Sequence, residues 1–152
     1  MADLLETRVT NRWIVGPNHA NNLEVAHGGT VLKWMDEVGA MSAMRFAGQA
    51  CVTARIEQVN FERPIPAGQV ALIESYVYDA GRTSVRVRLQ SFREDPRTGE
   101  TEGTTESYSV YVAIDDDREP TPVPELRVES EEGERLREEA KRDETEISAE
   151  RA

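Results

Sequence analysis

One segment constrains the fold of this sequence more than any other, because it has the clear pattern of a helix. Between about Gly28 and Ala47 apolar residues recur at positions 31, 34, 35, 38 and 41, which is the spacing of an amphipathic helix with one buried face. The same segment contains small residues, among them Gly39 and Ala40, so another layer of backbone can approach it closely. The sequence therefore predicts a single core helix held tightly against a sheet.

The rest of the chain up to about residue 115 has the pattern of β-strands. A first strand is expected over residues 4–15, where β-branched and aromatic residues precede a Gly16-Pro17 turn. After the helix, the same kind of pattern predicts strands at 50–61, 69–79, 83–93 and 103–114. Short turn segments separate these strands, as between antiparallel neighbours. The predicted order is one strand, a long helix and a four-stranded antiparallel meander.

The last part of the chain has a different composition. Three prolines, at positions 120, 122 and 124, precede a charged segment with few apolar residues, which cannot build a core of its own. Its acidic and basic residues can form helix-stabilising pairs, so we expect a partly helical surface segment with a frayed end. We place one domain at residues 4–126 and an acidic tail at 127–152. The tail either docks on a neighbouring subunit or only solvates the assembly.

The charge of the chain excludes some partners. A net charge of −11 over 152 residues argues against nucleic acid, because a phosphate-binding surface needs a basic field. Lysine occurs only at Lys33 and Lys141, and so acidic a surface repels itself unless salt screens it. This favours a halophilic protein, with an ordinary acidic bacterial protein as the alternative. The sequence has neither a membrane-spanning run nor a signal peptide, so we expect a cytoplasmic protein without a membrane partner.

The sequence offers little material for a metal site. Cys51 is the single cysteine, so there is no internal disulfide, and its apolar neighbours favour a small buried side chain over a nucleophile. The two histidines, His19 and His27, are eight residues apart with no cysteine cluster, which predicts that there is no metal. Because no second triad member lies near His27, we expect it to contact a ligand or the backbone.

Candidate catalytic and substrate-binding residues lie at the start of the predicted helix and along it. Gly28 and Gly29 would let a ligand approach unpaired helix N–H groups, which carry partial positive charge and could stabilise an oxyanion. The alternative is that the two glycines only permit close packing. Asp36 lies in an apolar stretch, where a carboxylate needs a partner or a task such as that of a general base. Spacing alone, however, favours a solvated helix carboxylate.

Four segments together resemble the hot-dog acyl-CoA thioesterases, the group of brain acyl-CoA hydrolase and the bacterial YciA-like enzymes. They are PNHANNLEVAHGGTVLKWMDEVGAM, VTARIEQVNFERPIPAGQV, GRTSVRVRLQS and YSVYVAIDDDREPTPVP, and the resemblance covers roughly residues 8–125. It implies an α+β hot-dog fold, in which a five-stranded antiparallel sheet wraps around helix 28–47. It also implies hydrolysis of fatty acyl-CoA to a free fatty acid and CoA, with no metal and no bound organic cofactor.

The resemblance also implies roles for residues near the helix. Asp36 matches the family's catalytic aspartate, which acts as general base toward water or as nucleophile on the thioester carbonyl. Asn21 matches a catalytic asparagine that positions water or substrate. His27, Gly28 and Gly29 match the helix start that contacts the substrate and polarises the thioester oxygen.

The family further implies an assembly. The Asn and Asp of one site come from opposite subunits of a homodimer, and three dimers form a hexamer. The CoA nucleotide is expected at the turn Arg82-Thr83-Ser84, where a guanidinium and hydroxyls suit phosphate oxygens. A plain hairpin turn is the alternative there.

Two other functions remain as alternatives to hydrolysis. A non-catalytic acyl-CoA-binding or sensing protein could share the fold, although Asp36 and Asn21 favour an enzyme. A hot-dog dehydratase would use a histidine and a carboxylate in a pattern that this sequence lacks. Acyl chain length is not predicted, because the shape of a tunnel at the dimer interface sets it.

Overall fold

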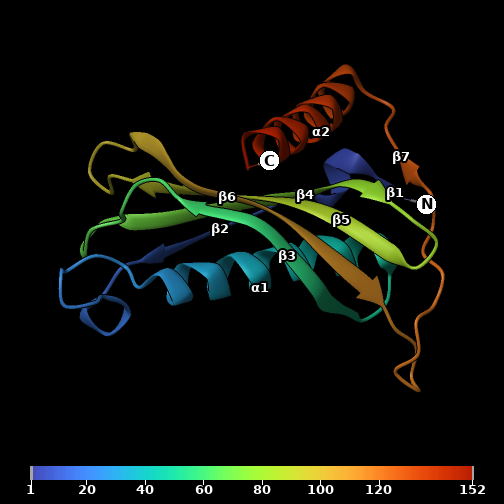
Figure 1. The fold of residues 1–152 in the computed structure, drawn as a ribbon, viewed down its shortest axis with the longest axis horizontal. Helices are drawn as coiled ribbons and strands as arrows, with labels where there is room; N and C mark the ends of the chain where they lie inside the picture. The colour runs from blue at the N-terminus through green and yellow to red at the C-terminus, as the bar shows by residue number, and fades with distance from the viewer. Residues whose placement is uncertain (1, 152) are drawn as a thin grey trace.

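A curved five-stranded antiparallel sheet forms the centre of the computed structural model, which describes the backbone of residues 2–151 and the side chains of residues 3–146. The strand order is β2-β4-β5-β6-β3. Helix α1 (Gly28–Ala47) lies along the concave face, and helix α2 (Glu131–Arg151) lies on the convex face (Figure 1). The strand bounds are β2 Val9–Ile14, β3 Cys51–Phe61, β4 Val70–Ala80, β5 Ser84–Glu94 and β6 Thr101–Ala113.

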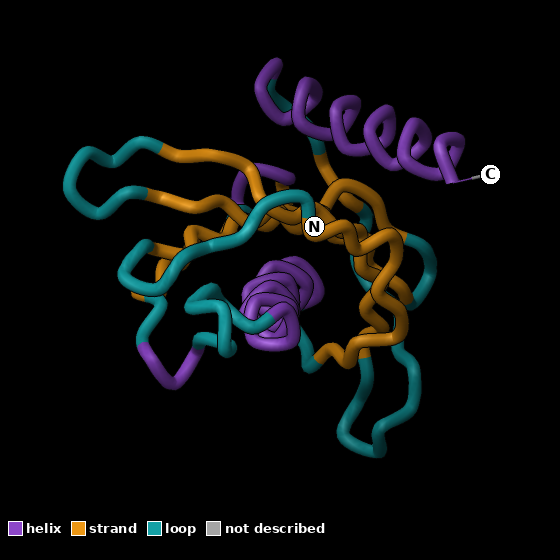
Figure 2. The backbone as a smooth tube through the Cα atoms, turned by 60° about the vertical axis from the view of Figure 1, so that its left-hand side comes forward, coloured by secondary structure: helices purple, strands orange, loops and turns teal. Residues whose placement is uncertain are grey.

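These elements confirm the predicted hot-dog architecture. The sheet encloses α1 when the molecule is seen along the helix (Figure 2). The helix begins and ends at the predicted residues, and the four later strands lie within two residues of the predicted ranges. Two short elements, β1 (Ala2–Asp3) and β7 (Leu126–Arg127), add a small parallel pair.

The prediction of a strand over residues 4–15 was wrong in its first half. Residues Leu4–Thr7 form a 3-10 helix, and the strand begins only at Val9. The Asp3 carboxylate accepts a hydrogen bond from the Leu5 amide (3.2 Å), and the Thr7 hydroxyl donates to the Leu4 carbonyl (2.6 Å). Leu4 is fully buried. Capping and burial of this leucine therefore prevail over the β propensity of the segment.

Helix α1 packs closely because it has a small residue where the sheet is nearest. A Cβ on Gly39 would overlap the Tyr111 hydroxyl and come within 2.8 Å of Leu89 Cδ2. The helix ends at Gly48, whose φ of 68° is left-handed and whose N–H bonds to the Met44 carbonyl at 2.8 Å. Nine side chains or glycines of α1 are buried: Val31, Trp34, Met35, Val38, Gly39, Ser42, Ala43, Phe46 and Ala47.

Helix α2 docks on the chain's own sheet, which neither expectation for the tail foresaw. Three tyrosines of the convex face, Tyr76, Tyr78 and Tyr108, form a buried cluster with Leu136 and Ala140 of the helix and with Leu4. The Tyr76 hydroxyl donates to the Leu136 carbonyl at 2.8 Å. The tail lacks a core of its own, as predicted, but it shares a small one with the sheet.

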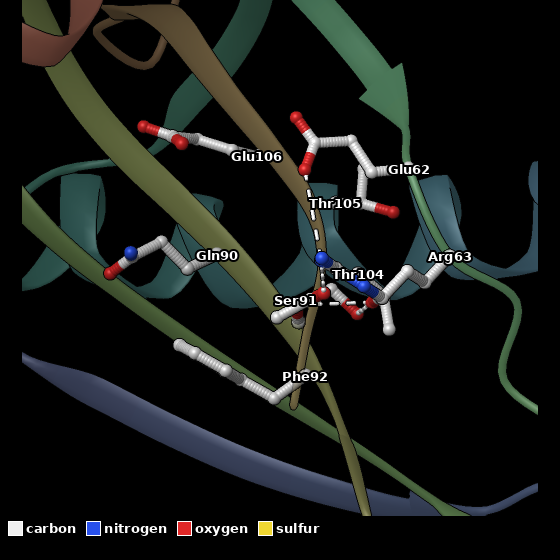
Figure 3. A pocket seen from close by; sticks show the side chains of 9 residues that line it. Glu62, Arg63, Gln90, Ser91, Phe92, Thr104, Thr105 and Glu106 are labelled. Atoms are coloured by element: carbon white, nitrogen blue, oxygen red, sulfur yellow. Dashed lines mark hydrogen bonds and ion pairs between the residues drawn. The ribbon is translucent and has the colours of Figure 1, made fainter. Parts of the chain in front are cut away.

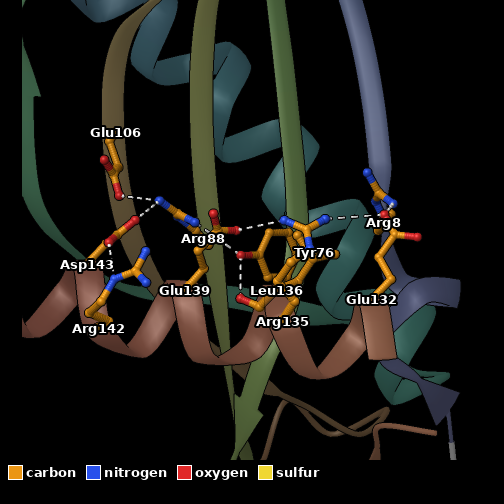
Figure 4. A network of polar contacts seen from close by, with 10 residues as sticks. All are labelled: Arg8, Tyr76, Arg88, Glu106, Glu132, Arg135, Leu136, Glu139, Arg142 and Asp143. Atoms are coloured by element: carbon orange, nitrogen blue, oxygen red, sulfur yellow. Dashed lines mark hydrogen bonds and ion pairs between the residues drawn. The ribbon is translucent and has the colours of Figure 1, made fainter. Parts of the chain in front are cut away.

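Ion pairs add to this contact (Figure 4). Arg88 is 5% exposed and donates to Glu106 (2.9 Å), to Asp143 of α2 (2.5 Å) and to the Tyr76 hydroxyl (3.3 Å). Because an arginine this deeply buried needs its charge balanced, Asp143 fixes the position of α2 along the sheet.

Candidate active site

Asp36 lies on α1 at the point where the helix faces the ends of two strands. Its Oδ1 accepts hydrogen bonds from the Thr53 hydroxyl of β3 (2.8 Å) and the Tyr111 hydroxyl of β6 (3.0 Å). The Tyr111 oxygen also lies 3.1 Å from the Asp36 carbonyl oxygen. Two donors on one carboxylate oxygen fix the orientation of the group, which is half-buried rather than fully solvated.

Tyr111 is a donor in this arrangement and stays one. It is fully buried, and burial raises the pKa of its hydroxyl, with further increases from the negative charge of Asp36 and from their hydrogen bond. The phenol is therefore protonated at any physiological pH and cannot serve as a base. Its role is to hold the aspartate.

The start of α1 presents backbone N–H groups next to the two glycines. His27 is the N-cap, and its carbonyl accepts from the Thr30 amide (3.0 Å) and the Val31 amide (3.1 Å). The backbone N–H groups of Gly28 and Gly29 come just before those of Thr30 and Val31 in the chain. They lie in the first turn of the helix, where N–H donors lack a partner within the helix. The His27 side chain is exposed and makes no capping bond. The helix start can therefore donate to an approaching oxygen.

Asn21 lies in the loop before α1 and organises that loop. Its side-chain Oδ1 accepts from the backbone amides of Leu23 (2.9 Å) and Val25 (3.4 Å), and its backbone N–H donates to the Val25 carbonyl (2.9 Å). Glu24 between them has a φ of 60°. Within the described part of this single chain, no hydrogen bond joins Asn21 to Asp36.

The turn Arg82-Thr83-Ser84 closes the hairpin between β4 and β5. The Thr83 carbonyl accepts from the Ala113 amide (3.0 Å), and the Arg82 carbonyl accepts from the Val123 amide (2.9 Å). Val85, next along the chain, pairs with Tyr111. The turn is thus at the same end of the sheet as Asp36, and the exposed Arg82 side chain lines a hollow of about 450 Å³.

Two further features carry no catalytic chemistry. A small hollow of about 100 Å³ lies at the other end of the sheet (Figure 3), where Arg63 donates to the Gly103 carbonyl at 2.9 Å and the Thr104 hydroxyl donates to the Ser91 carbonyl at 3.1 Å. Cys51 is half-buried, and burial raises the pKa of its thiol to about 11. A thiol with that pKa is a poor nucleophile.

Across residues 3–146, the His, Cys, Asp and Glu side chains form no group of three that could hold a metal ion. Neither α1 nor α2, as far as each is described, is long and apolar enough to cross a bilayer.

Two residues of the site, Thr53 and Tyr111, do not stand out in the sequence. Each is a hydroxyl residue on a strand, where such residues are common. Only the tertiary placement of β3 and β6 against α1 shows that both hydroxyls reach Asp36. The alternation of β6, which turns every second side chain toward the helix, is the one signal that could have indicated Tyr111.

Comparison with known proteins connects this geometry to a family. The family model of the thioesterase superfamily matches residues 23–100. The chain is 33% identical over 127 residues to the uncharacterized acyl-CoA thioester hydrolase YkhA of Bacillus subtilis, covering 84% of this chain and 74% of the relative. It is also 33% identical over 145 residues to the mouse cytosolic acyl coenzyme A thioester hydrolase, which covers 88% of this chain and 38% of that protein.

Solved structures connect the chain to the same family. An acyl-CoA hydrolase from Staphylococcus aureus, in complex with butyryl-CoA and CoA, has a TM-score of 0.85 and 28% identity, covering 99% of this chain and 92% of that one. A hexameric acyl-CoA thioesterase has a TM-score of 0.85 and 34% identity, with 99% and 97% covered. The chain therefore belongs to the thioesterase superfamily, among the acyl-CoA thioester hydrolases with the hot-dog fold.

Proposed function

We propose that this chain hydrolyses fatty acyl-CoA to a free fatty acid and CoA, with Asp36 as the catalytic carboxylate. The observation that carries the proposal is the fixed orientation of Asp36 between the hydroxyls of Thr53 and Tyr111. A carboxylate held this way on the central helix suits a general base better than a surface charge. Thr53 and Tyr111 act through Asp36, so they are positioning residues.

The spacing of three residues supports this assignment. Solved variants of the Staphylococcus aureus hydrolase replace, each by alanine, an asparagine, an aspartate and a threonine at positions 28, 43 and 60 of that protein. The intervals are 15 and 17 residues. Asn21, Asp36 and Thr53 are separated by the same two intervals in this chain. We infer that the three residues correspond.

The reaction can be written with groups of the chain and one water molecule. Asp36 takes a proton from water as the oxygen adds to the thioester carbonyl, and helix N–H groups at Gly28 and Gly29 donate to the oxyanion. The C–S bond then breaks, and the CoA sulfur takes up the proton from Asp36. Direct attack by Asp36, followed by hydrolysis of the anhydride, is the alternative route. Neither route needs a metal or an organic cofactor.

One site needs two subunits. Gly28 and Asp36 are eight residues apart on one helix, so about 12 Å of helix separates them. An oxyanion donor and a general base must both lie within about 3 Å of the reacting atoms. The Asp36 of one subunit must therefore act with the Asn21, His27 and helix start of another.

The edge of the sheet offers a surface for this pairing. Strand β3 is the last strand of the sheet, and Val52 and Phe61 on it are 46% and 52% exposed. Exposed apolar groups on an edge strand favour pairing with a second copy. We propose a homodimer through β3. We also propose a trimer of dimers, because two thioesterases of similar structure, one of them from Yersinia pestis, are hexameric.

The remaining details follow from the same arrangement. We place the CoA nucleotide at Arg82-Thr83-Ser84, since that turn lies beside Tyr111 and offers a guanidinium and two hydroxyls. We place the enzyme in the cytoplasm, in keeping with the cytosolic mouse relative. A place in fatty acid metabolism follows only from the proposed substrate.

The test of the catalytic assignment is Asp36→Asn. Asparagine keeps the shape of the side chain but cannot take a proton, so we expect release of CoA thiol from palmitoyl-CoA and shorter esters to fall by on the order of 10³-fold or more. The thermal unfolding midpoint should stay close to that of the original protein. Near-normal turnover by this variant would refute the role of Asp36. Tight binding of esters by the original protein without thiol release would establish the sensing alternative.

The test of the shared site mixes two impaired chains, Asp36→Asn and Asn21→Ala, of which Asn21→Ala should have the smaller loss of rate. A dimer of Asp36→Asn and Asn21→Ala chains has one site with both lesions and one site with none. Statistical reassembly should therefore restore about a quarter of the original activity. If Asn21 and Asp36 act within one chain, every site in the mixture carries a lesion and no activity returns.

A further inference from the structure

His19 contacts both ends of the loop that carries Asn21. At the start of the loop, the Gly16 N–H donates to Nδ1 of the His19 ring at 3.1 Å, and the His19 N–H donates to the Gly16 carbonyl at 3.0 Å. At the end of the loop, the His19 carbonyl accepts from the N–H of His27 at 2.9 Å, and His27 is the N-cap of α1. Contacts of this one residue therefore close the loop around Asn21.

The ring of His19 also packs on the core. Its centroid lies 4.9 Å from that of Trp34 on α1, and the two planes meet edge-on at 77°. Trp34 is 5% exposed and stacks on Trp13 of β2, with 5.0 Å between the ring centroids and 6° between the planes. Aromatic pairs in these two arrangements attract each other. The three rings therefore hold the loop against both α1 and β2.

The hydrogen bond at the start of the loop depends on the acceptor in the His19 ring. A ring nitrogen accepts only when it carries no proton, so the ring proton of this histidine is on Nε2. The Gly16 N–H that donates to Nδ1 is partly buried, and a buried N–H without an acceptor is costly. Loss of the acceptor would therefore open the turn between Gly16 and His19 toward water.

We propose that His19 is a positioning residue, which holds the Asn21 loop in the conformation that the reaction needs. The proposal rests on the proposed function, in which Asn21 acts in one site with the Asp36 of another subunit. Only Ala20 separates His19 from Asn21, and Ala20 forms a bridge with Ala26. A displacement of His19 is therefore passed directly to Asn21.

Two substitutions at His19 separate the acceptor from the ring. His19→Phe keeps a ring on Trp34 and removes the acceptor, whereas His19→Asn removes the ring and keeps an acceptor close to the position of Nδ1. For His19→Phe we expect kcat for thiol release to fall about 10-fold with little change in KM, since Asn21 then acts from the wrong position in the transition state. His19→Asn should keep at least about half of the original kcat. The matched control is Asn18→Ala, at an exposed position of the same turn, which should keep both constants.

A double variant tests whether His19 acts through Asn21. The kcat of His19→Phe combined with Asn21→Ala should equal that of Asn21→Ala alone, because a positioning residue has no effect once the residue that it positions is gone. A purely structural role would instead lower kcat further in the double variant. If His19→Phe does not fold, His19→Gln takes its place, because the acceptor of glutamine lies farther from the backbone than Nδ1.

Mixed oligomers show in which half of the site His19 acts. Because the loop and the Asp36 of one site come from opposite subunits, a dimer of His19→Phe and Asp36→Asn chains has one site free of substitutions. About a quarter of the original activity should return. With Asn21→Ala as the partner, every site carries one substitution in its loop, so no activity should return beyond that of the two parent chains.

The outcomes separate the two proposals. An unchanged kcat in folded His19→Phe, an equal loss in His19→Asn, or a further loss in the double variant would overturn the role of His19 and leave the hydrolase intact. Recovery in the mixture with Asn21→Ala would overturn that role as well. Near-normal turnover by Asp36→Asn, or no thiol release from any ester, would instead refute the proposed function.

Discussion

Helices α1 and α2 have nearly the same length, 20 and 21 residues, and pack on opposite faces of one sheet (Figure 1). Nine residues of α1 are buried. In the described part of α2, the buried residues are Gly133, Leu136 and Ala140. The inner helix is thus held by packing, whereas the outer helix depends on a small apolar contact and on ion pairs such as Arg88 with Asp143.

This difference indicates which of the two helices can hold a side chain in a precise position. A close-packed interior tolerates little displacement, so the buried face of α1 holds in place the helix that carries Asp36. The contact of α2 is smaller, and beside the part-buried pair Arg88–Asp143 it uses exposed pairs such as Arg8–Glu132, which contribute little free energy. Reactive groups are expected on the first helix and not on the second.

The largest effect is expected at the closest contact of the inner helix. Gly39→Val would drive Tyr111 and Leu89 away from α1, so we expect a loss of about 3 kcal/mol in the free energy of unfolding, together with reduced turnover. Urea unfolding measures the loss. Gly29→Ala is the matched control for stability, because a Cβ there meets nothing within 4 Å. Equal losses in both variants would show that packing against the sheet is not what constrains α1.

A smaller effect is expected on the outer helix. Leu136 is 8% exposed and makes the main apolar contact of α2. Leu136→Ala removes this contact and should cost about 2 kcal/mol in the free energy of unfolding. Turnover per folded molecule should persist, because no proposed site residue lies on α2. Glu138→Ala, on an exposed position of the same helix, serves as the control. Loss of turnover in folded Leu136→Ala would mean that the outer helix takes part in the site.

Salt should raise the stability of the whole chain and weaken one contact of α2. With a net charge of −11, screening of self-repulsion should raise the free energy of unfolding by about 1 kcal/mol between about 0.05 and 1 M KCl. The exposed pair Arg8–Glu132 at 3.4 Å should weaken, so α2 should become more susceptible to trypsin over the same range. Unfolding measured by circular dichroism in both buffers tests the halophile prediction. Equal stability in the two would reject it.

The smallest effect is expected at Cys51, at the start of β3. Burial raises the pKa of its thiol from 9.0 to about 11, so the neutral thiol stabilises the fold below about pH 9, and this contribution is lost as the pH rises through about 11. Cys51→Ala should keep its turnover and lose less stability between those two pH values. Rapid thiol alkylation of the folded protein at neutral pH would contradict the raised pKa.

The parts of the fold that could be predicted are those with local signals. The periodicity of α1 and the glycine at its end define its bounds, and turns between alternating residues define β4, β5 and β6. The segment Leu4–Thr7 and the docking of α2 could not be predicted in this way. Both depend on one cluster of side chains from residues more than 60 positions apart in the chain, such as Leu4 and Tyr76.

The same limit holds for the site. Spacing alone left Asp36 as an ordinary helix carboxylate, and the family resemblance gave it a role. Thr53 and Tyr111 were missed because nothing near them in the sequence marks them. Their hydroxyls acquire significance through the packing of two strands against one helix, which is a property of the whole fold. The predicted roles of Asn21 and of the Arg82 turn stay predictions, and the mixing experiment decides that of Asn21.

The hydrogen bonds that Asn21 makes within its own loop fix the orientation of its side-chain amide. The side-chain oxygen already accepts from the Leu23 and Val25 amides, so in the site that we propose the group left to face a substrate is the NH₂ group, which can only donate. The loop therefore presents a fixed positive pole before any substrate arrives. An aspartate at this position could keep both loop bonds, yet it would offer the incoming oxygen a negative charge. Whether an amide or a carboxylate stands at this position thus decides whether the loop can donate a hydrogen bond to an oxygen of the water or the thioester.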